Sequence, residues 1–328
     1  MRTVVLLGLL AACGHDAPAQ RQVALGSSDP WGSPARGSGA ARDGAVGSGA
    51  IAPPLSADER HARAQRLCAT VTPYFYELAK DGKVSHILGT RHVGVAFAML
   101  PQVVHDDLHA AKLAVFEFAP DDKSQFTAPD EPLRDELGEA DWRHFEELVG
   151  LPTADLLERG TAAAAVISMA VEPEDLTAIL DKEIQDDVAT AHIPARGLET
   201  AEFQDHVLAR LLDLRLLKAT IETTKSRADM EADAAKDLRE YCAGTNTKPG
   251  TDDETRAKLK KAGYSDAEID AQDDTLVFSR NRDWIPKLEE LFAQGDVFVA
   301  VGADHLIGAK GVIALLQRHG FTAKRITQ

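Results

Sequence analysis

Hydrophobic and polar positions follow different patterns at the ends of the chain and in its middle. Residues 74–78 and 84–88 are short apolar runs on either side of an Asp-Gly turn at 80–83, which predicts a β-hairpin. Residues 112–118 and 296–301 are continuous apolar runs, which are typical of buried strands. Because a strand needs neighbouring strands, we expect both ends of the chain to contribute to one sheet.

The middle of the chain has helical periodicity instead. Residues 101–112 place Val103, Val104 and Leu108 on one face of a predicted helix. Ser56 opens a capping-box pattern that predicts an earlier helix. Further helices are expected at 140–149, 173–190 and 308–319, a long amphipathic stretch at 200–227, a final strand at 321–326, and either a strand or an extended turn at 193–198. The pattern predicts an α/β (α+β) fold, in which N- and C-terminal strands form a central mixed sheet around a large helical middle region.

Composition narrows the class of protein. Apolar residues make up 44% of the chain and charged residues 27%, as in soluble globular domains. The 52 acidic residues outnumber the 36 Lys and Arg residues, which gives a net charge of −16. Since a phosphate backbone repels such a chain, we expect no nucleic-acid partner.

The first residues are similar to a bacterial lipoprotein signal peptide. One cation, Arg2, precedes an apolar run at 4–10, which is shorter than the ~20 residues that span a bilayer. The run ends in Leu-Ala-Ala-Cys, which resembles a lipobox and implies cleavage before Cys13 and lipidation of its thiol. Gly14 at the next position resembles signals for the outer membrane in enteric bacteria. The alternative is an ordinary secretory signal with an incidental cysteine.

Three segments follow from these observations. Residues 1–12 are expected to be the signal peptide. Residues 13–55 comprise the lipidated cysteine and a tether rich in Gly, Ser, Ala and Pro, which buries too little apolar surface to fold. Residues 56–328 form the folded domain. The expected location is a bacterial membrane, most consistent with the outer membrane, with the domain facing the periplasm or the cell surface.

Two copies of a short motif follow predicted strands. Gly89 and Gly302 each stand three residues before a histidine, His92 or His305, and directly after an apolar run. Parallel strands deliver such residues to one edge of a sheet, where α/β folds place their sites. Two imidazoles at one edge predict a divalent-metal site. The alternative is two surface histidines after glycine turns.

Polar residues in otherwise apolar surroundings add to this candidate site. Glu117 interrupts the most apolar strand, and a buried carboxylate needs a partner. Glu199 follows a short predicted strand and precedes a helix, where it is either a site residue or a helix N-terminal charge. Asn281 and Arg282 lie in a helical stretch, in which arginine suits a carboxylate or an oxyanion and a solvated basic face is the alternative.

The order of these motifs resembles the TraB/GumN family. Ile-Leu-Gly-Thr-Arg-His at 87–92, Phe-Glu in a strand, Gly-Leu-Glu-Thr-Ala-Glu at 197–202, Ser-Arg-Asn-Arg at 279–282 and Val-Gly-Ala-Asp-His at 301–305 carry the resemblance over roughly residues 66–328. The family includes the Tiki metalloproteases and looks related to erythromycin-esterase-like and ChaN-like proteins.

The resemblance implies roles for individual residues. His92, Glu117 and His305 would be ligands of a divalent metal such as Mn, Co or Zn, and Glu117 or Glu199 the general base. From side-chain chemistry we also expect Arg282 to take part in catalysis, and Asn281 and Arg91 in substrate binding. Arg91 stands where the family usually has an apolar residue, and Asp304 where it usually has a small one.

Cys68 and Cys242 are the two cysteines that remain after Cys13. In an oxidising periplasm they would form a disulfide, and the alternative is two unpaired thiols.

Three functions agree with these patterns. The first is a membrane-anchored, metal-dependent hydrolase of the peptidase type, acting on a peptide or a small molecule at a site where His92, Glu117 and His305 converge. The second is a lipoprotein that captures a peptide or signal at the same place without catalysis. The third is a lipoprotein that handles haem or iron.

Overall fold

The computed structural model describes residues 66–122, 131–170 and 179–327. The expected signal peptide, Cys13, the tether and the capping box at Ser56 lie outside these residues.

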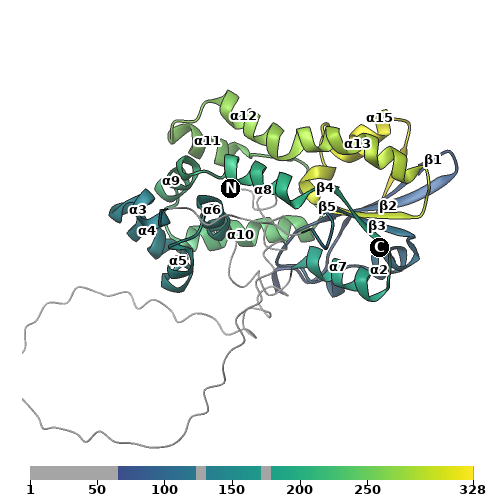
Figure 1. Cartoon of the computed structure of the whole chain (residues 1–328), viewed down its shortest axis with the longest axis horizontal. Coiled ribbons are helices and arrows are strands. Elements are labelled where there is room, and N and C mark those ends of the chain that lie inside the picture. Colours follow the sequence, from purple (N-terminus) through teal and green to yellow (C-terminus); the bar gives the residue numbers. More distant parts are fainter. Residues whose placement is uncertain (1–65, 123–130, 171–178, 328) are drawn as a thin grey trace, which may run out of the picture.

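A six-stranded mixed sheet forms the centre of the described structure (Figure 1). The strand order is β4-β3-β5-β2-β1-β6. Strands β4, β3, β5 and β2 are parallel, whereas β1 is antiparallel to both β2 and β6. The bounds are β1 Tyr74–Lys80, β2 Lys83–Thr90, β3 Leu113–Phe118, β4 Ala195–Glu199, β5 Val297–Gly302 and β6 Thr322–Ile326. The predicted fold class is confirmed, because N- and C-terminal strands share this sheet.

The hairpin between β1 and β2 forms at the predicted turn. Asp81 and Gly82 both have positive φ angles, of 51° and 75°. This conformation matches the right-handed twist of the flanking strands, and Asp-Gly adopts it readily. The register pairs Lys80 with Lys83 and Tyr74 with Gly89. The first glycine–histidine motif is thereby anchored to the sheet.

Helices cover both faces of the sheet (Figure 1). Helices α2 (Gln102–Ala110) and α7 (Leu180–Thr190) lie on one face, and α13 (Ser279–Phe292) and α15 (Val312–Arg318) lie on the other. Apolar side chains of all four helices pack with the strands in one hydrophobic core. Helix α15 begins four residues later than predicted, because Gly308 has a φ of 76° and a turn precedes the helix.

The helical middle has a hydrophobic core of its own. The predicted stretch 200–227 is broken, since Asp213 accepts a hydrogen bond from Leu216 N and begins a new helix. The helices of this region are α3 Leu133–Leu137, α4 Glu139–Val149, α5 Leu151–Leu157, α6 Ala162–Ala170, α8 Ala201–Leu211, α9 Leu214–Thr223, α10 Arg227–Cys242, α11 Asp253–Lys261 and α12 Asp266–Asp273. Within the described residues, every helix is too short or too polar to cross a membrane.

A disulfide joins the segment before β1 to the helical middle. Cys68 and Cys242 are bonded, with their Cα atoms 5.6 Å apart. Cys242 is the last residue of α10, so the bridge ties the end of this helix to the start of the sheet.

Candidate functional site

The two glycine–histidine motifs leave neighbouring parallel strands at the same edge of the sheet. Strand β2 ends at Thr90, directly before Arg91 and His92, and strand β5 runs into the short helix α14 (Ala303–Leu306), which carries His305. The two strands are paired in parallel, with Thr90 opposite Gly302. The sequence motif is therefore also a spatial repeat.

Glu117 lies between the two histidines. It comes from β3, the other neighbour of β5, and its Oε1 accepts a hydrogen bond of 2.9 Å from Gly302 N. Oε1 is 3.8 Å from His305 Nε2. A Cβ atom added at Gly302 would lie 3.3 Å from Glu117 Oε1 and 3.1 Å from His92 Nε2. The structure thus brings His92, Glu117 and His305 together around Gly302.

A carboxylate is hydrogen-bonded to Nδ1 of His92. Asp181, in the first turn of α7, lies 2.6 Å from Nδ1 through Oδ2 and accepts a 2.8 Å hydrogen bond from Thr90 Oγ1 through Oδ1. The Nδ1 hydrogen therefore points at Asp181, and Nε2 faces Glu117. Burial alone would lower the pKa of His92. The charge and hydrogen bond of Asp181, together with the charge of Glu117, outweigh burial, and the pKa lies above its ordinary value.

A side-chain amide is hydrogen-bonded to Nδ1 of His305. Asn281 donates from Nδ2 to the Lys310 carbonyl at 3.0 Å, so its Oδ1 faces His305 Nδ1 at 2.6 Å and accepts its hydrogen. The imidazole also packs on Trp284, with ring centroids 4.4 Å apart. An amide brings no negative charge, so burial dominates and lowers the pKa of His305 to about 3. His305 is therefore a neutral imidazole with its Nε2 lone pair facing Glu117.

Arg280 joins the two carboxylates of the cluster. Its Nη2 lies 2.6 Å from Glu117 Oε2 and 2.5 Å from Glu199 Oε1. Gln204 Nε2 donates to the same Oε2 of Glu117 at 2.9 Å, and Trp284 Nε1 donates to Glu199 at 3.2 Å. Four elements, β3, β4, α8 and α13, thus supply one buried polar network.

Arg280 shifts the two carboxylates in different directions. Burial would raise the pKa of Glu117, but Arg280, followed by the two histidines, holds this pKa well below its ordinary value. For Glu199 burial prevails, and the pKa lies above its ordinary value although Arg280 opposes the rise. Two nearby carboxyl groups with diverging pKa values suit an acid–base pair.

The arginine at the site is Arg280, not Arg282. A π-helical turn, η3 (Asp274–Phe278), precedes α13, and Arg280, Asn281 and Trp284 then face the interior. The side chain of Arg282 is 52% exposed and pairs with Asp274 at 2.8 Å. Arg280 stands four residues before Trp284 and shares its helical face, which is a periodicity signal that the sequence contained.

The two residues expected to bind substrate, Asn281 and Arg91, are both buried. Asn281 is 0% exposed and supports His305. Arg91 is also 0% exposed, and its Nη1 donates to the Val93 carbonyl. A role of either side chain in substrate binding stays a prediction. Asp181 and Gln204 were missed, because both stand in polar helical stretches where nothing distinguishes them from surface residues.

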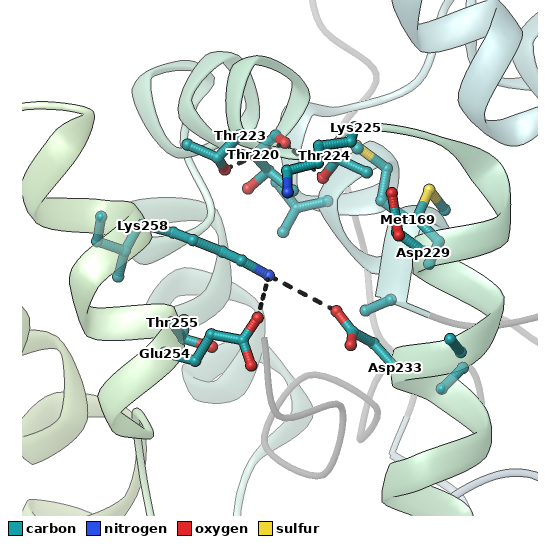
Figure 2. A pocket seen from close by; sticks show the side chains of 16 residues that line it. Met169, Thr220, Thr223, Thr224, Lys225, Asp229, Asp233, Glu254, Thr255 and Lys258 are labelled. Carbon is teal, nitrogen blue, oxygen red and sulfur yellow. Dashed lines mark hydrogen bonds and ion pairs between the residues drawn. The ribbon is translucent and has the colours of Figure 1, made fainter.

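A separate cavity of about 200 Å³ lies in the helical middle, between α6, α9, α10 and α11 (Figure 2). Lys258 points into it, 3.1 Å from Glu254 and 3.7 Å from Asp233. The hydroxyl of Thr223 donates to a backbone carbonyl of its own helix. Lys258 is thus paired within the cavity, and the lining contains no histidine. We therefore assign the candidate site to the cluster around Glu117.

The predicted divalent-metal site depends on how the donor atoms are arranged. Within residues 66–122, 131–170 and 179–327, no group of three or more His, Cys, Asp or Glu side chains is arranged to hold a metal ion. The donors themselves suit a divalent cation. His92 and His305 direct Nε2 inward, and Glu117 Oε1 accepts a hydrogen bond from Gly302 N with one of the two lone pairs of a carboxylate oxygen. The donor chemistry fits a divalent cation, and its binding requires these side chains to move closer together.

The sequence of this chain matches a known protein family. The sequence model of the TraB/PrgY/gumN family matches residues 74–325. This range includes five strands of the sheet in full, all of β6 except its last residue, and every residue of the cluster around Glu117. No curated protein and no solved structure matches the chain.

Proposed function

Because the chain belongs to the TraB/PrgY/gumN family, we propose that it is a metal-dependent hydrolase that cleaves a peptide or a small carbonyl compound at the cluster of His92, Glu117 and His305. The observation that carries the proposal is the convergence of two imidazole Nε2 atoms on one carboxylate, with each Nδ1 held by its own partner. Second partners of this kind fix the tautomer and orientation of metal-binding histidines.

His92 and His305 would hold the cation through Nε2, and Glu117 through Oε1. A bound divalent cation polarises a carbonyl and makes a water molecule more acidic. Arg280 keeps Glu117 ionised, and Asp181 and Asn281 keep both Nε2 atoms directed inward.

Glu199 would carry the proton. Its raised pKa suits a group that takes a proton from water and returns it to a leaving group. Its two hydrogen bonds to Arg280, of 2.5 and 3.1 Å, keep the carboxyl group beside Glu117.

Cobalt binding and peptide cleavage test the proposal together. The full chain is stripped with a chelator, reloaded with Mn²⁺, Co²⁺ or Zn²⁺, and incubated with a defined peptide mixture that is followed by mass spectrometry. Cleavage should stop with the chelator and return with a metal. His305→Gln should abolish Co²⁺ binding and cleavage, whereas His319→Gln, at an exposed histidine paired with Glu289, should change neither. Because a ligand imidazole must be neutral, Co²⁺ binding should strengthen as pH rises.

Other outcomes identify the alternative functions. Peptides that bind without being cleaved would replace the hydrolase by a capture protein. A visible absorption band after addition of haem would favour the haem-handling function. Failure of the wild-type chain to bind any of the three metals would overturn the metal-dependent proposal.

We also propose that the chain is a lipoprotein anchored through Cys13, with residues 13–55 as a tether and the domain facing the periplasm or the cell surface. The apolar run that ends in Leu-Ala-Ala-Cys supports this proposal. Expressed in a bacterium with labelled fatty acid, the wild-type chain should incorporate label and Cys13→Ala should not. Equal labelling of the two chains would exclude this anchor.

A further inference from the structure

The segment 241–246 lies against both glycine–histidine motifs. The Tyr241 hydroxyl donates a 2.9 Å hydrogen bond to the carbonyl of Gly89, three residues before His92. The Asn246 side chain donates at 3.3 Å to Asp304, the residue before His305. One short segment, at the end of α10, therefore contacts the two chain segments that deliver the imidazoles.

This segment is firmly attached to the sheet. Cys242 is bonded to Cys68, and its carbonyl accepts a 2.7 Å hydrogen bond from Thr72 N. The Asn246 carbonyl accepts a 3.0 Å hydrogen bond from the Tyr74 hydroxyl. The segment is thus held at both ends, by a covalent bond and by buried hydrogen bonds.

The turn inside the segment is closely packed. Gly244 has a φ of 64°, and a Cβ atom there would lie 2.6 Å from the Thr72 carbonyl oxygen. Arg325, from β6, donates to the Gly244 carbonyl at 3.1 Å. A glycine is required at this position, both for its positive φ and for the close approach of Thr72.

The Tyr241 hydroxyl is suited to its contact. The residue is 2% exposed, and its ring lies 5.7 Å from that of Tyr74. Burial raises the pKa of Tyr241, and a hydrogen bond with the backbone of Arg91 only partly opposes the rise. The hydroxyl therefore remains a neutral donor, and it contacts the first motif on both sides of Thr90.

We propose that Tyr241 and Asn246 are positioning residues, which hold the two histidine motifs at the separation where both imidazoles reach Glu117. The disulfide anchors the segment that carries them. The effect of this positioning on catalysis rests on the proposed function. The positioning itself concerns only where His92 and His305 lie. Loss of either contact should let one motif shift and leave the other in place.

The test uses nuclear magnetic resonance of the full chain labelled with ¹⁵N in its histidine rings. Tyr241→Phe removes one hydroxyl and should shift or broaden the ring signals of His92 more than those of His305. Asn246→Ala should act mainly on His305. Replacing both cysteines, Cys68→Ser with Cys242→Ser, should affect both histidines. Signals are assigned with His92→Gln and His305→Gln.

Tyr264→Phe is the matched control. Tyr264 is also buried, at 5% exposure, but it belongs to the helical core, and its hydroxyl has no hydrogen-bond partner among the described residues. This variant should leave both histidine signals unchanged. Thermal unfolding of each variant is recorded, so that a general loss of structure is distinguished from a local shift.

The outcomes separate this inference from the proposed function. Ring signals of Tyr241→Phe and Asn246→Ala identical to those of the wild type would overturn the positioning role, whatever the metal result. If the wild type binds Co²⁺, Tyr241→Phe should weaken binding by about 10-fold, as when an outer partner of a metal site is lost. Altered ring signals in a chain that binds no Co²⁺ would support the positioning and contradict only the metal.

Discussion

His92 and His305 each follow a glycine by three residues at the end of a parallel strand, yet their Nδ1 atoms meet different partners. His92 faces the carboxylate of Asp181, and His305 faces the amide of Asn281. The pKa of His92 lies above its ordinary value and that of His305 falls to about 3. A repeated motif sets the position of an imidazole, while the helix packed behind it sets the charge.

The difference matters because both rings face the same carboxylate. Glu117 Oε1 lies 3.8 Å from His305 Nε2 and beside Gly302, which His92 Nε2 also approaches. One ring that favours a proton and one that rejects it, around an ionised glutamate, form an asymmetric site.

Removing the positive charge of Arg280, which pairs with both Glu117 and Glu199, should have the largest effect on stability. Arg280→Met would leave Glu117 and Glu199 buried without their cation, at a cost of about 3–5 kcal/mol in the free energy of unfolding. Arg282→Met, two residues away, removes only an exposed pair and should cost less than about 1 kcal/mol. Urea denaturation of both variants checks the difference. Equal stabilities would mean that Arg280 is not the centre of the network.

The two motif glycines should respond differently to alanine. A Cβ atom at Gly89 would lie 2.9 Å from both Ala303 Cα and Tyr74 Cβ, so Gly89→Ala should destabilise the fold by about 1–3 kcal/mol through overpacking.

At Gly302 the new methyl group would meet side-chain atoms of the site instead, 3.1 Å from His92 Nε2. Gly302→Ala should therefore cost less stability than Gly89→Ala and disturb the ring signals of His92 more. Thermal unfolding and histidine spectra of the two variants test this order, which the reverse ranking would contradict.

Exchanging the side chains that face the two Nδ1 atoms should change the pKa values of His92 and His305 in opposite directions. Asn281→Asp places a carboxylate against His305 and should raise its pKa from about 3, while Asp181→Asn should lower the pKa of His92. Histidine-selective spectra recorded against pH measure both. Unchanged titration of His305 in Asn281→Asp would show that burial, not the partner, determines its charge.

The smallest expected effect is the pH dependence of stability in metal-free protein. The folded pKa of His305 lies below its unfolded value, so its contribution is complete above about 6.5 and is lost as pH falls. The folded pKa of His92 is raised, so its contribution is complete below about 6.5 and is lost as pH rises through the folded value.

Between pH 8 and 5, His305→Gln should therefore gain stability relative to wild type on acidification, by about 2 kcal/mol, and His92→Gln should lose it. Urea unfolding at several pH values decides. Parallel curves for the two variants would contradict the assigned environments.

Local chemistry made much of the fold predictable. Asp81-Gly82 specifies its turn, and the continuous apolar runs that form β3 and β5 are typical of strands buried in a sheet. The break between α8 and α9 was not foreseen, because a helix cap such as Asp213 is a single polar residue among many. The place of His92, Glu117 and His305 was predictable, since each belongs to a strand end or strand and parallel strands end together.

The sequence by itself determined which residues enter the sheet and at which edge the motifs emerge, because both depend on periodicity and on local turn chemistry. The periodicity of α13 placed Arg280 on the face that it shares with Trp284, but only the tertiary structure decided that Arg280 meets Glu117 and Glu199. It alone also decided that Asp181 meets His92 and that Asn281 meets His305. These partners lie 24 to 163 residues apart along the chain. Their contacts arise from the rotation and packing of α7 and α13 against the sheet, which no local pattern encodes.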